Sequence, residues 1–407
     1  MINKIFKLEI FTILFILFST VISLIGGFVF IFYKVYEYRY LNLSSQYFKI
    51  YLFIFILINL IIIIYKSRFN INNYEKKKFT DLKIFNLILV ILLFFMMPFQ
   101  LYYLLSLVQK GIYYGSLDFA RYEFYKEAFL PRLFWYSSFL FGYLLILKKF
   151  NYLNKYLINF IIMIELIILI LYGSKILFIF PIISYIISLN YLGIDYYDKR
   201  DKINIASFLI LILIILPIYN NIRSSLSYKQ SEVFLIDLSA SIMPEQRDGA
   251  FLIFYLDETY KDNNYIKVIG QSVLCSLLGS KRISSLLLDI NYDYYLEKYI
   301  NIIQLSLGYH NFNPRIGLIG SSYIFGGRLF GYIGPLIYIF ILIVNILLFY
   351  KNYPKFGLLE LYSFILIYLY FLYTFNSDFI INLPWVIYNI QFYFILKIIK
   401  IITHKIK

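Results

Sequence analysis

Long apolar runs are the feature that most restricts what this chain can fold into. The chain has 407 residues, of which 61% are hydrophobic. The apolar residues stand in runs of about 17–25, the length with which an α-helix crosses the ~30 Å hydrocarbon core of a bilayer. Only 15% of the residues are charged, against roughly 25% in a soluble domain. The sequence therefore predicts a membrane protein and argues against a soluble enzyme, a nucleic-acid-binding protein and a disordered chain.

The runs predict an all-α polytopic fold, because backbone in contact with lipid must satisfy its hydrogen bonds internally. About ten transmembrane helices are expected, with one large extracytoplasmic loop between the seventh and eighth. This divides the chain into an N-terminal transmembrane bundle (1–219), the loop (220–330) and the C-terminal transmembrane helices (331–407). The expected spans are 8–33, 47–65, 84–107, 132–147, 156–172, 176–194, 203–219, 331–350, 357–375 and 384–402.

The distribution of Lys and Arg predicts the orientation, since short cytoplasmic loops carry the basic excess. With both termini in the cytoplasm, the cytoplasmic segments hold 20 basic and seven acidic residues, and the outer segments hold 18 and 15. The net charge of +15 is then a topology signal and does not indicate a nucleic-acid partner. The first span is long and has no small-residue cleavage site, so we expect an uncleaved anchor.

Common catalytic signatures are missing from the sequence. Cys275 is the one cysteine, and His310 and His404 are the two histidines, so neither an intrachain disulfide nor a metal cluster is expected. There is no Gly-x-Ser-x-Gly nucleophile elbow and no phosphate-binding Gly-rich loop. We predict no cofactor, and any reaction must use a substrate that carries its own leaving group.

The expected outer loop, 220–330, balances ten basic with ten acidic residues. Within it, Ile266, Ile269, Val273 and Leu277 recur at helical spacing and stop before Gly279. This spacing predicts an amphipathic helix, which would either lie at the membrane surface or pack in a small outer domain. A balanced, partly apolar loop suits a polar, flexible substrate such as a glycan.

Basic side chains of the outer segments are the candidates for binding a phosphorylated substrate, because guanidinium groups bind phosphate oxygens in a bidentate way. The alternative is that each one extends toward lipid headgroups or forms a surface ion pair. Arg247 and Arg315 are favoured, because Arg247 lies among charged residues and Arg315 precedes a Gly-rich segment. The other basic candidates are Arg121, Lys175, Arg223 and Arg328, and His310 is considered with them.

Glu165 is the carboxylate that falls near the middle of an expected span. Burying it ionised costs at least ~3 kcal/mol on insertion scales. We expect it to face a polar interior, to be protonated, or to find a partner such as Asn345 or Gln391. Both a structural hydrogen bond and a catalytic or transport role remain open.

The segment 311–334 carries a resemblance to a known family. Its parts Asn311-Phe312-Asn313-Pro314-Arg315-Ile316-Gly317 and Ser321 to Gly334 resemble the pattern by which oligosaccharide repeat-unit polymerases, the Wzy-type O-antigen and capsule polymerases, return to the membrane after their large outer loop. Gly173-Ser174-Lys175 resembles a Gly-Ser-Arg/Lys turn of the same family, and Ala120-Arg121 is similar to its arginine-bearing outer loop.

The resemblance implies a membrane glycosyltransferase of the bacterial plasma (inner) membrane. Such an enzyme joins oligosaccharide repeat units carried on undecaprenyl pyrophosphate into a lipopolysaccharide O-antigen or a capsule, with a flippase and a chain-length regulator as partners. Arg247 and Arg315 would stabilise the departing pyrophosphate, and Glu245, Asp248 or Glu258 would deprotonate the acceptor. The substrate-binding residues would be Arg121, Lys175, Arg223, Arg328, His310 and Glu165.

Two other functions fit the same pattern. An O-antigen ligase has the same architecture and leaving group but another acceptor, and His310 could serve in it. A polysaccharide flippase or transporter is the second alternative, although the inverted repeats and broken helices typical of transporters are not evident in the sequence.

Overall fold

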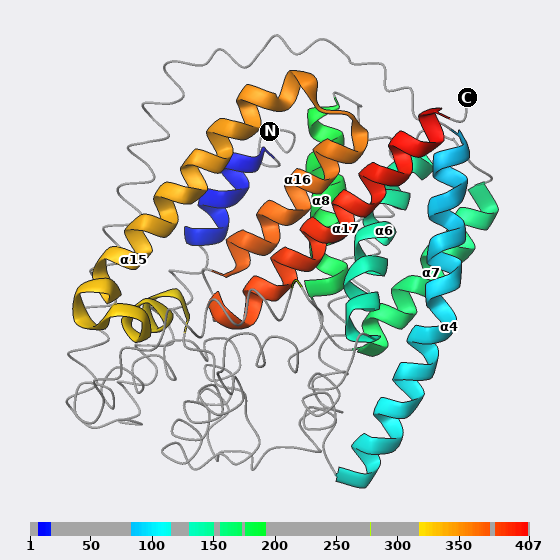
Figure 1. Cartoon of the computed structure of the whole chain (residues 1–407), viewed down its shortest axis with the longest axis horizontal. Coiled ribbons are helices and arrows are strands. Elements are labelled where there is room, and N and C mark those ends of the chain that lie inside the picture. The colour runs from blue at the N-terminus through cyan, green and yellow to red at the C-terminus, as the bar shows by residue number, and fades with distance from the viewer. Residues whose placement is uncertain are drawn as a thin grey trace.

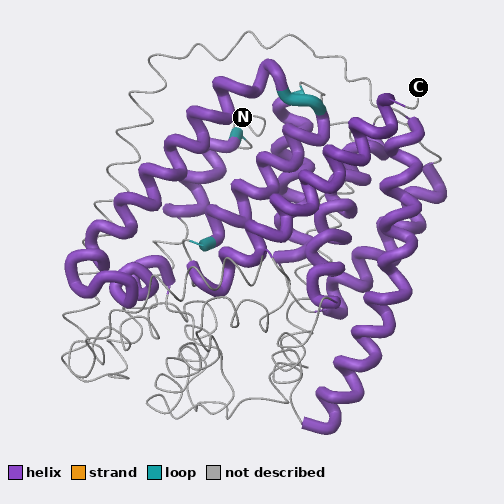
Figure 2. The backbone as a smooth tube through the Cα atoms, in the orientation of Figure 1, coloured by secondary structure: helices purple, strands orange, loops and turns teal. Residues whose placement is uncertain are grey.

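The computed structural model describes residues 7–17, 83–114, 130–149, 155–172, 176–192, 277, 317–374 and 379–405. Nearly all of these residues are helical, and none of them lies in a strand (Figure 2). The all-α class expected from the apolar runs is therefore confirmed for this part of the chain. The expected spans 47–65 and 203–219 lie outside the described residues.

Eight of the expected spans fall wholly or partly on described residues, and each is helical over most of that length. An N-terminal helix covers Leu8–Leu17. The labelled elements are α4 (Lys83–Tyr114), α6 (Leu130–Lys149), α7 (Lys155–Tyr172), α8 (Ile176–Tyr191), α15 (Gly317–Asn352), the 3-10 helix η1 (Tyr353–Lys355), α16 (Leu358–Tyr373) and α17 (Phe379–Lys405).

Three of these helices are long and apolar enough to cross a membrane. The apolar segments are Ile84–Gln109 in α4, Ile333–Lys355 in α15 and η1, and Trp385–His404 in α17, with 26, 23 and 20 residues. The helices α7, α8 and α16 are also apolar but shorter; 16 residues span only about 24 Å. Together the apolar helices indicate a membrane protein.

The helix α6 is the centre of the bundle. It packs against α4, α7, α8, α16 and α17 (Figure 1), and nearly all its side chains from Phe134 to Leu147 are buried. Gly142 allows this close packing, because a Cβ there would meet the Tyr362 hydroxyl and lie 2.7 Å from Pro181 Cβ. A small residue at a helix crossing is a common device in membrane bundles.

From α4 to α8, and again from α15 to α17, successive described helices run in opposite directions. We call the end of the bundle where residues 7 and 405 lie the termini end, and the opposite end the far end (Figure 1). The N-terminal helix, α4, α7 and α16 run from the termini end to the far end. The helices α6, α8, α15 and α17 run in the opposite direction.

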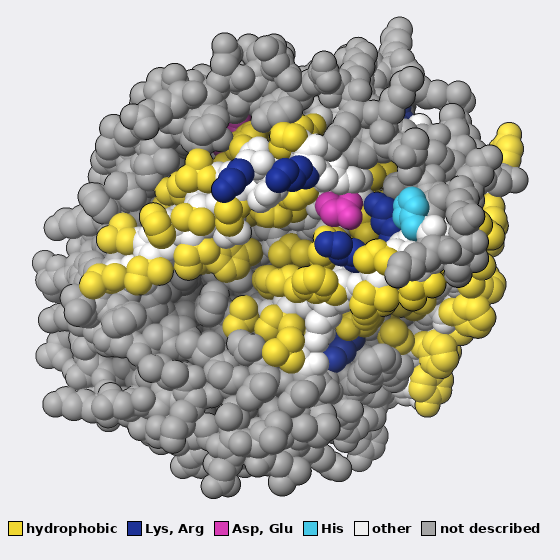
Figure 3. All heavy atoms as spheres, turned by 45° about the horizontal axis from the view of Figure 1, so that its top comes forward, with side chains coloured by type: hydrophobic (Ala, Val, Ile, Leu, Met, Phe, Trp, Pro, Cys, Tyr) yellow, Lys and Arg dark blue, Asp and Glu magenta, His cyan; other side chains and the backbone are white. Residues whose placement is uncertain are grey.

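Charged residues are distributed unequally between the two ends. Among the described residues, the far end has Lys110, Arg132 and Arg328 and no acidic residue. The termini end has two acidic residues, Glu9 and Glu360, and many basic side chains gather there (Figure 3). Its basic residues are Lys7, Lys83, Lys148, Lys149, Lys155, Lys351, Lys355, Lys397, Lys400 and Lys405.

Buried tyrosines tie the N-terminal helix to the termini end. Glu9 Oε2 accepts hydrogen bonds from the hydroxyls of Tyr191, at 3.3 Å, and Tyr350. The Tyr191 hydroxyl in turn accepts one from the Leu8 amide at 3.1 Å. This network joins the N-terminal helix to α8 and α15.

The helix α15 begins earlier than the sequence predicts. It starts at Gly317, so residues 317–330, which the sequence assigns to the outer loop, form about its first four turns. The first part of α15, yellow in Figure 1, runs across the far end before the helix turns into the bundle. Pro335 lies inside this helix, and a proline that removes a backbone donor is a usual cause of such a bend.

Candidate functional site

Two of the predicted site residues lie in described helices. Glu165 is in α7, and Arg328 is in the first part of α15, five residues before the apolar segment begins at Ile333. At about 1.5 Å per residue, Arg328 stands roughly 7.5 Å beyond that segment. The other predicted residues, Arg121, Lys175, Arg223, Glu245, Arg247, Asp248, Glu258, His310 and Arg315, lie outside the described residues.

Glu165 is fully buried where α7 meets α4 and α6. Gln100 Nε2, from α4, donates to Glu165 Oε1 at 3.1 Å and to Ser137 Oγ, from α6, at 2.6 Å. The Ser137 hydroxyl donates to the Phe134 carbonyl at 3.2 Å and also neighbours the Glu165 carboxyl. We call Gln100, Ser137 and Glu165 the Glu165 cluster.

The partners proposed for Glu165 from the sequence are wrong. Asn345 Nδ2 donates to the Ile341 carbonyl of its own helix at 2.8 Å. Gln391 Nε2 donates to the Leu277 carbonyl at 3.0 Å. Gln100 takes their place, because α4 and not α15 or α17 packs against α7. The sequence signal for it was a polar Gln near the middle of an apolar run.

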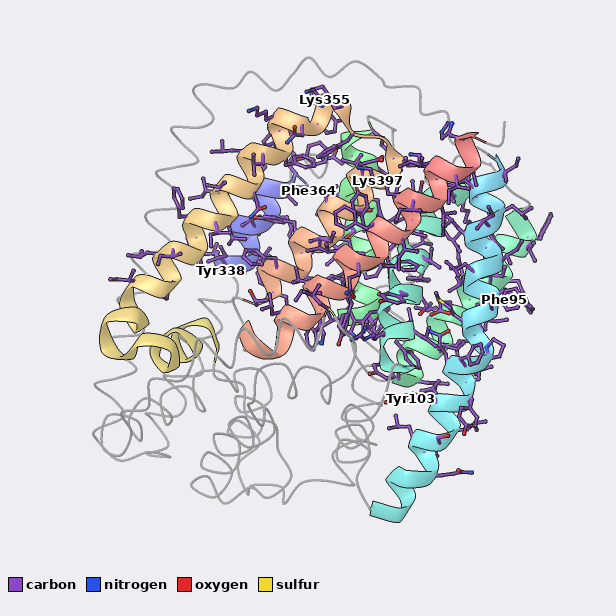
Figure 4. The ribbon with its side chains drawn as sticks, in the orientation of Figure 1. Phe95, Tyr103, Tyr338, Lys355, Phe364 and Lys397 are labelled. Atoms are coloured by element: carbon purple, nitrogen blue, oxygen red, sulfur yellow. The ribbon has the colours of Figure 1, made fainter. Side chains whose placement is uncertain are left out.

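The Glu165 cluster is enclosed by apolar and aromatic side chains. On the side of the far end, Phe134 and Tyr172 stack with ring centroids 4.1 Å apart, and Tyr103 lies edge-on to Phe134 at 5.4 Å. Tyr103 is on the inner side of α4, whereas Phe95 is on its outer side and 66% exposed (Figure 4). On the side of the termini end, the next helical turn of α4, α6 and α7 contributes the buried side chains of Met96, Leu140 and Ile161.

Arg132 is a basic residue of the far end that the sequence analysis did not select. It lies near the N-terminus of α6, and only 8% of its surface is exposed. Its guanidinium carbon stands 4.7 Å from the centre of the Tyr388 ring, in a cation–π contact. The signal available in the sequence was Pro131-Arg132 at the start of an expected span, since Pro favours the first helical turn.

The two tryptophans of the chain are neighbours of this contact. Trp135 follows Arg132 by three residues on α6, and Trp385 is on α17, the helix that carries Tyr388. Trp135 and Trp385 stack with ring centroids 4.8 Å apart, and Tyr370 lies edge-on to Trp135 at 5.4 Å. Trp135 is 2% exposed, and its Nε1 has no hydrogen-bond acceptor among the described residues. The described part of the far end therefore presents a buried cation beside a cluster of aromatic rings.

One residue of the segment 220–316 is described. Leu277 is helical, and its carbonyl accepts the hydrogen bond from Gln391, six residues into the apolar segment of α17. This point of the expected amphipathic helix therefore lies alongside α17. The rest of that helix is outside the described residues.

Within the described ranges, no group of three or more His, Cys, Asp or Glu side chains could hold a metal ion. Comparison of the chain with models of protein families, with curated proteins and with solved structures gives no match.

Proposed function

We propose that this protein polymerises oligosaccharide repeat units, carried on undecaprenyl pyrophosphate, at the outer face of a bacterial plasma membrane. The observation that carries the proposal is the resemblance of residues 311–334 to Wzy-type polymerases, in a chain with several apolar helices that are long enough, or nearly long enough, to cross a membrane. The proposed product is an O-antigen or a capsular polysaccharide.

The charge distribution supports the orientation that this function needs. Ten basic residues against two acidic ones at the described termini end are what the positive-inside rule expects of a cytoplasmic face. The helix α8 ends at the termini end and α15 begins at the far end. The chain between them must therefore pass from one side to the other, which agrees with one further crossing at 203–219 followed by an outer loop.

The proposed chemistry needs cations near the outer surface of the membrane. The acceptor hydroxyl of one unit forms a bond to the anomeric carbon of the growing chain, the bond from that carbon to the lipid pyrophosphate breaks, and the hydroxyl proton passes to a base. Because pyrophosphate is already a good leaving group, positioning and stabilisation of its charge are the main requirements. We assign the stabilisation to Arg247 and Arg315, and the base to Glu245, Asp248 or Glu258.

The test is polymer length in cells. Arg247→Ala and Arg315→Ala should each abolish long polymer at normal protein levels. Lys355→Ala is the matched control, because Lys355 is exposed at the termini end and its loss should leave polymer length unchanged. Normal polymer in both arginine variants would remove these residues from the active site.

Gene deletion distinguishes the polymerase from the ligase. A deletion strain should retain single repeat units on its surface if the protein is a polymerase, whereas loss of a ligase leaves long polymer on the lipid carrier. Elongation of lipid-linked units by the purified protein would decide against a flippase, which forms no glycosidic bond.

A further inference from the structure

The Glu165 cluster has fewer hydrogen atoms than buried acceptor atoms. Gln100 has two amide hydrogens, which go to Ser137 Oγ and Glu165 Oε1, and Ser137 has one hydroxyl hydrogen, which goes to the Phe134 carbonyl. Two buried acceptor atoms, Glu165 Oε2 and Gln100 Oε1, have no donor among the described residues. If the Ser137 hydroxyl turns to the Glu165 carboxyl instead, one of the two is still left without a donor.

A carboxylate anion fits this environment poorly. Glu165 is fully buried, about 15 Å along α7 from Lys155 and about 10 Å from Tyr172. An intramembrane charge without a cation partner is costly, and a buried acceptor without a donor is costly too. A proton on Oε2 removes the charge and gives that oxygen a hydrogen of its own.

Charged groups on the helices packed against α7 lie away from Glu165. On α6, Arg132 precedes Ser137 by five residues and points about 140° away around the helix, toward Tyr388. The hydroxyls of Tyr103 and Tyr172 belong to the aromatic layer on the side of the far end, where the two rings lie 6.1 Å apart. The remaining titratable residues of the three packed helices are Lys83, Tyr102, Lys110, Tyr113 and Tyr114 of α4, Tyr136, Tyr143, Lys148 and Lys149 of α6, and Tyr185 and Tyr191 of α8.

We propose that the Glu165 cluster is an enclosed proton-binding site. The Glu165 carboxyl group holds a proton on Oε2 at neutral pH, Gln100 fixes the orientation of the carboxyl through Oε1, and Ser137 holds the Gln100 amide in place. The proton supplies the hydrogen that Oε2 lacks, and it removes the charge from the contact of α4, α6 and α7. The site does not depend on the proposed sugar-polymer chemistry.

Infrared spectroscopy tests this directly, because a protonated carboxyl has a carbonyl stretching band that a carboxylate lacks. We expect the purified protein at pH 7 to show this band, and Glu165→Gln to lose it. Glu360→Gln is the matched control. Glu360 lies 3.6 Å from Lys400 Nζ at the termini end, away from the Glu165 cluster, so its replacement should leave the band unchanged.

Two results would overturn the proposal. One is a difference spectrum between wild type and Glu165→Gln that shows the loss of a carboxylate band and no loss of an acid band. The other is disappearance of the acid band when sodium chloride is added, since the site would then bind a metal cation in place of the proton. The measurement requires neither substrate nor enzymatic activity, so a failure of the proposed function would not affect it.

Discussion

The replacement Gly142→Ala probes the packing at the centre of the bundle. A Cβ at this position would lie 2.7 Å from Pro181 Cβ and 2.9 Å from the Pro181 carbonyl oxygen, whereas ordinary contacts are 3.4–4 Å. The helices α6 and α8 would therefore have to separate by about 0.7–1.3 Å. Overpacking of this kind costs about 1–3 kcal/mol. Alanine in a helix interior normally stabilises by roughly 0.5–1 kcal/mol relative to glycine, which leaves a net loss of about 0–2.5 kcal/mol. We expect about 1–2 kcal/mol, because the new Cβ meets a proline ring and backbone that cannot turn aside.

Such a loss raises the ratio of unfolded to folded protein roughly 5–30-fold. Unfolding in mild detergent with increasing sodium dodecyl sulfate can be followed by tryptophan fluorescence, because Trp135 and Trp385 stack on each other within the bundle. Tyr362→Phe removes the hydroxyl that the new Cβ would meet, so the double variant should lose less than the two single losses together. Equal or greater stability of Gly142→Ala would refute the close approach of α6 and α8.

Three further predictions concern polar groups at the two ends. Glu9→Gln weakens the hydrogen bonds that Tyr191 and Tyr350 donate, and it should lower the free energy of unfolding by about 1–2 kcal/mol in the same titration. Glu360→Gln breaks a partly exposed ion pair with Lys400 and should cost no more than about 1 kcal/mol; a larger loss than in Glu9→Gln would contradict the greater weight given to the two tyrosine hydrogen bonds. Arg132→Lys keeps the charge but replaces the planar group that lies over Tyr388, and it should lower the free energy of unfolding by about 0.5–2 kcal/mol in the same titration.

The positions of the helices could be predicted from the sequence because apolar length is a local property. The expected span 132–147 agrees with α6 at Leu130–Lys149, and 156–172 agrees with α7 at Lys155–Tyr172. The early start of α15 could not be predicted in this way. Its first turns contain Gly317, Gly320, Gly326 and Gly327, and glycine is unfavourable in helices, so the segment has the composition of a loop.

The partners of the polar residues depend on which helices are neighbours in the bundle. The local sequence around a residue does not encode these neighbours. Glu165 could have been paired with any polar residue near the middle of another span. Its contact with Gln100 follows only once α4 packs against α7. Arg132 was missed for the same reason, because its aromatic partner Tyr388 comes from α17, far away in the sequence.

The central claim is that the segment after α8 reaches the outer face while the termini end stays in the cytoplasm. Single cysteines placed in a Cys275→Ser background, one at Lys229 and one at Lys355, test it with a membrane-impermeant maleimide on intact cells. Cys275 is replaced because it stands two residues from Leu277, which lies alongside α17. We predict labelling at position 229 in intact cells, and labelling at position 355 only after the cells are opened. Labelling at position 355 but not at 229 in intact cells would contradict the account.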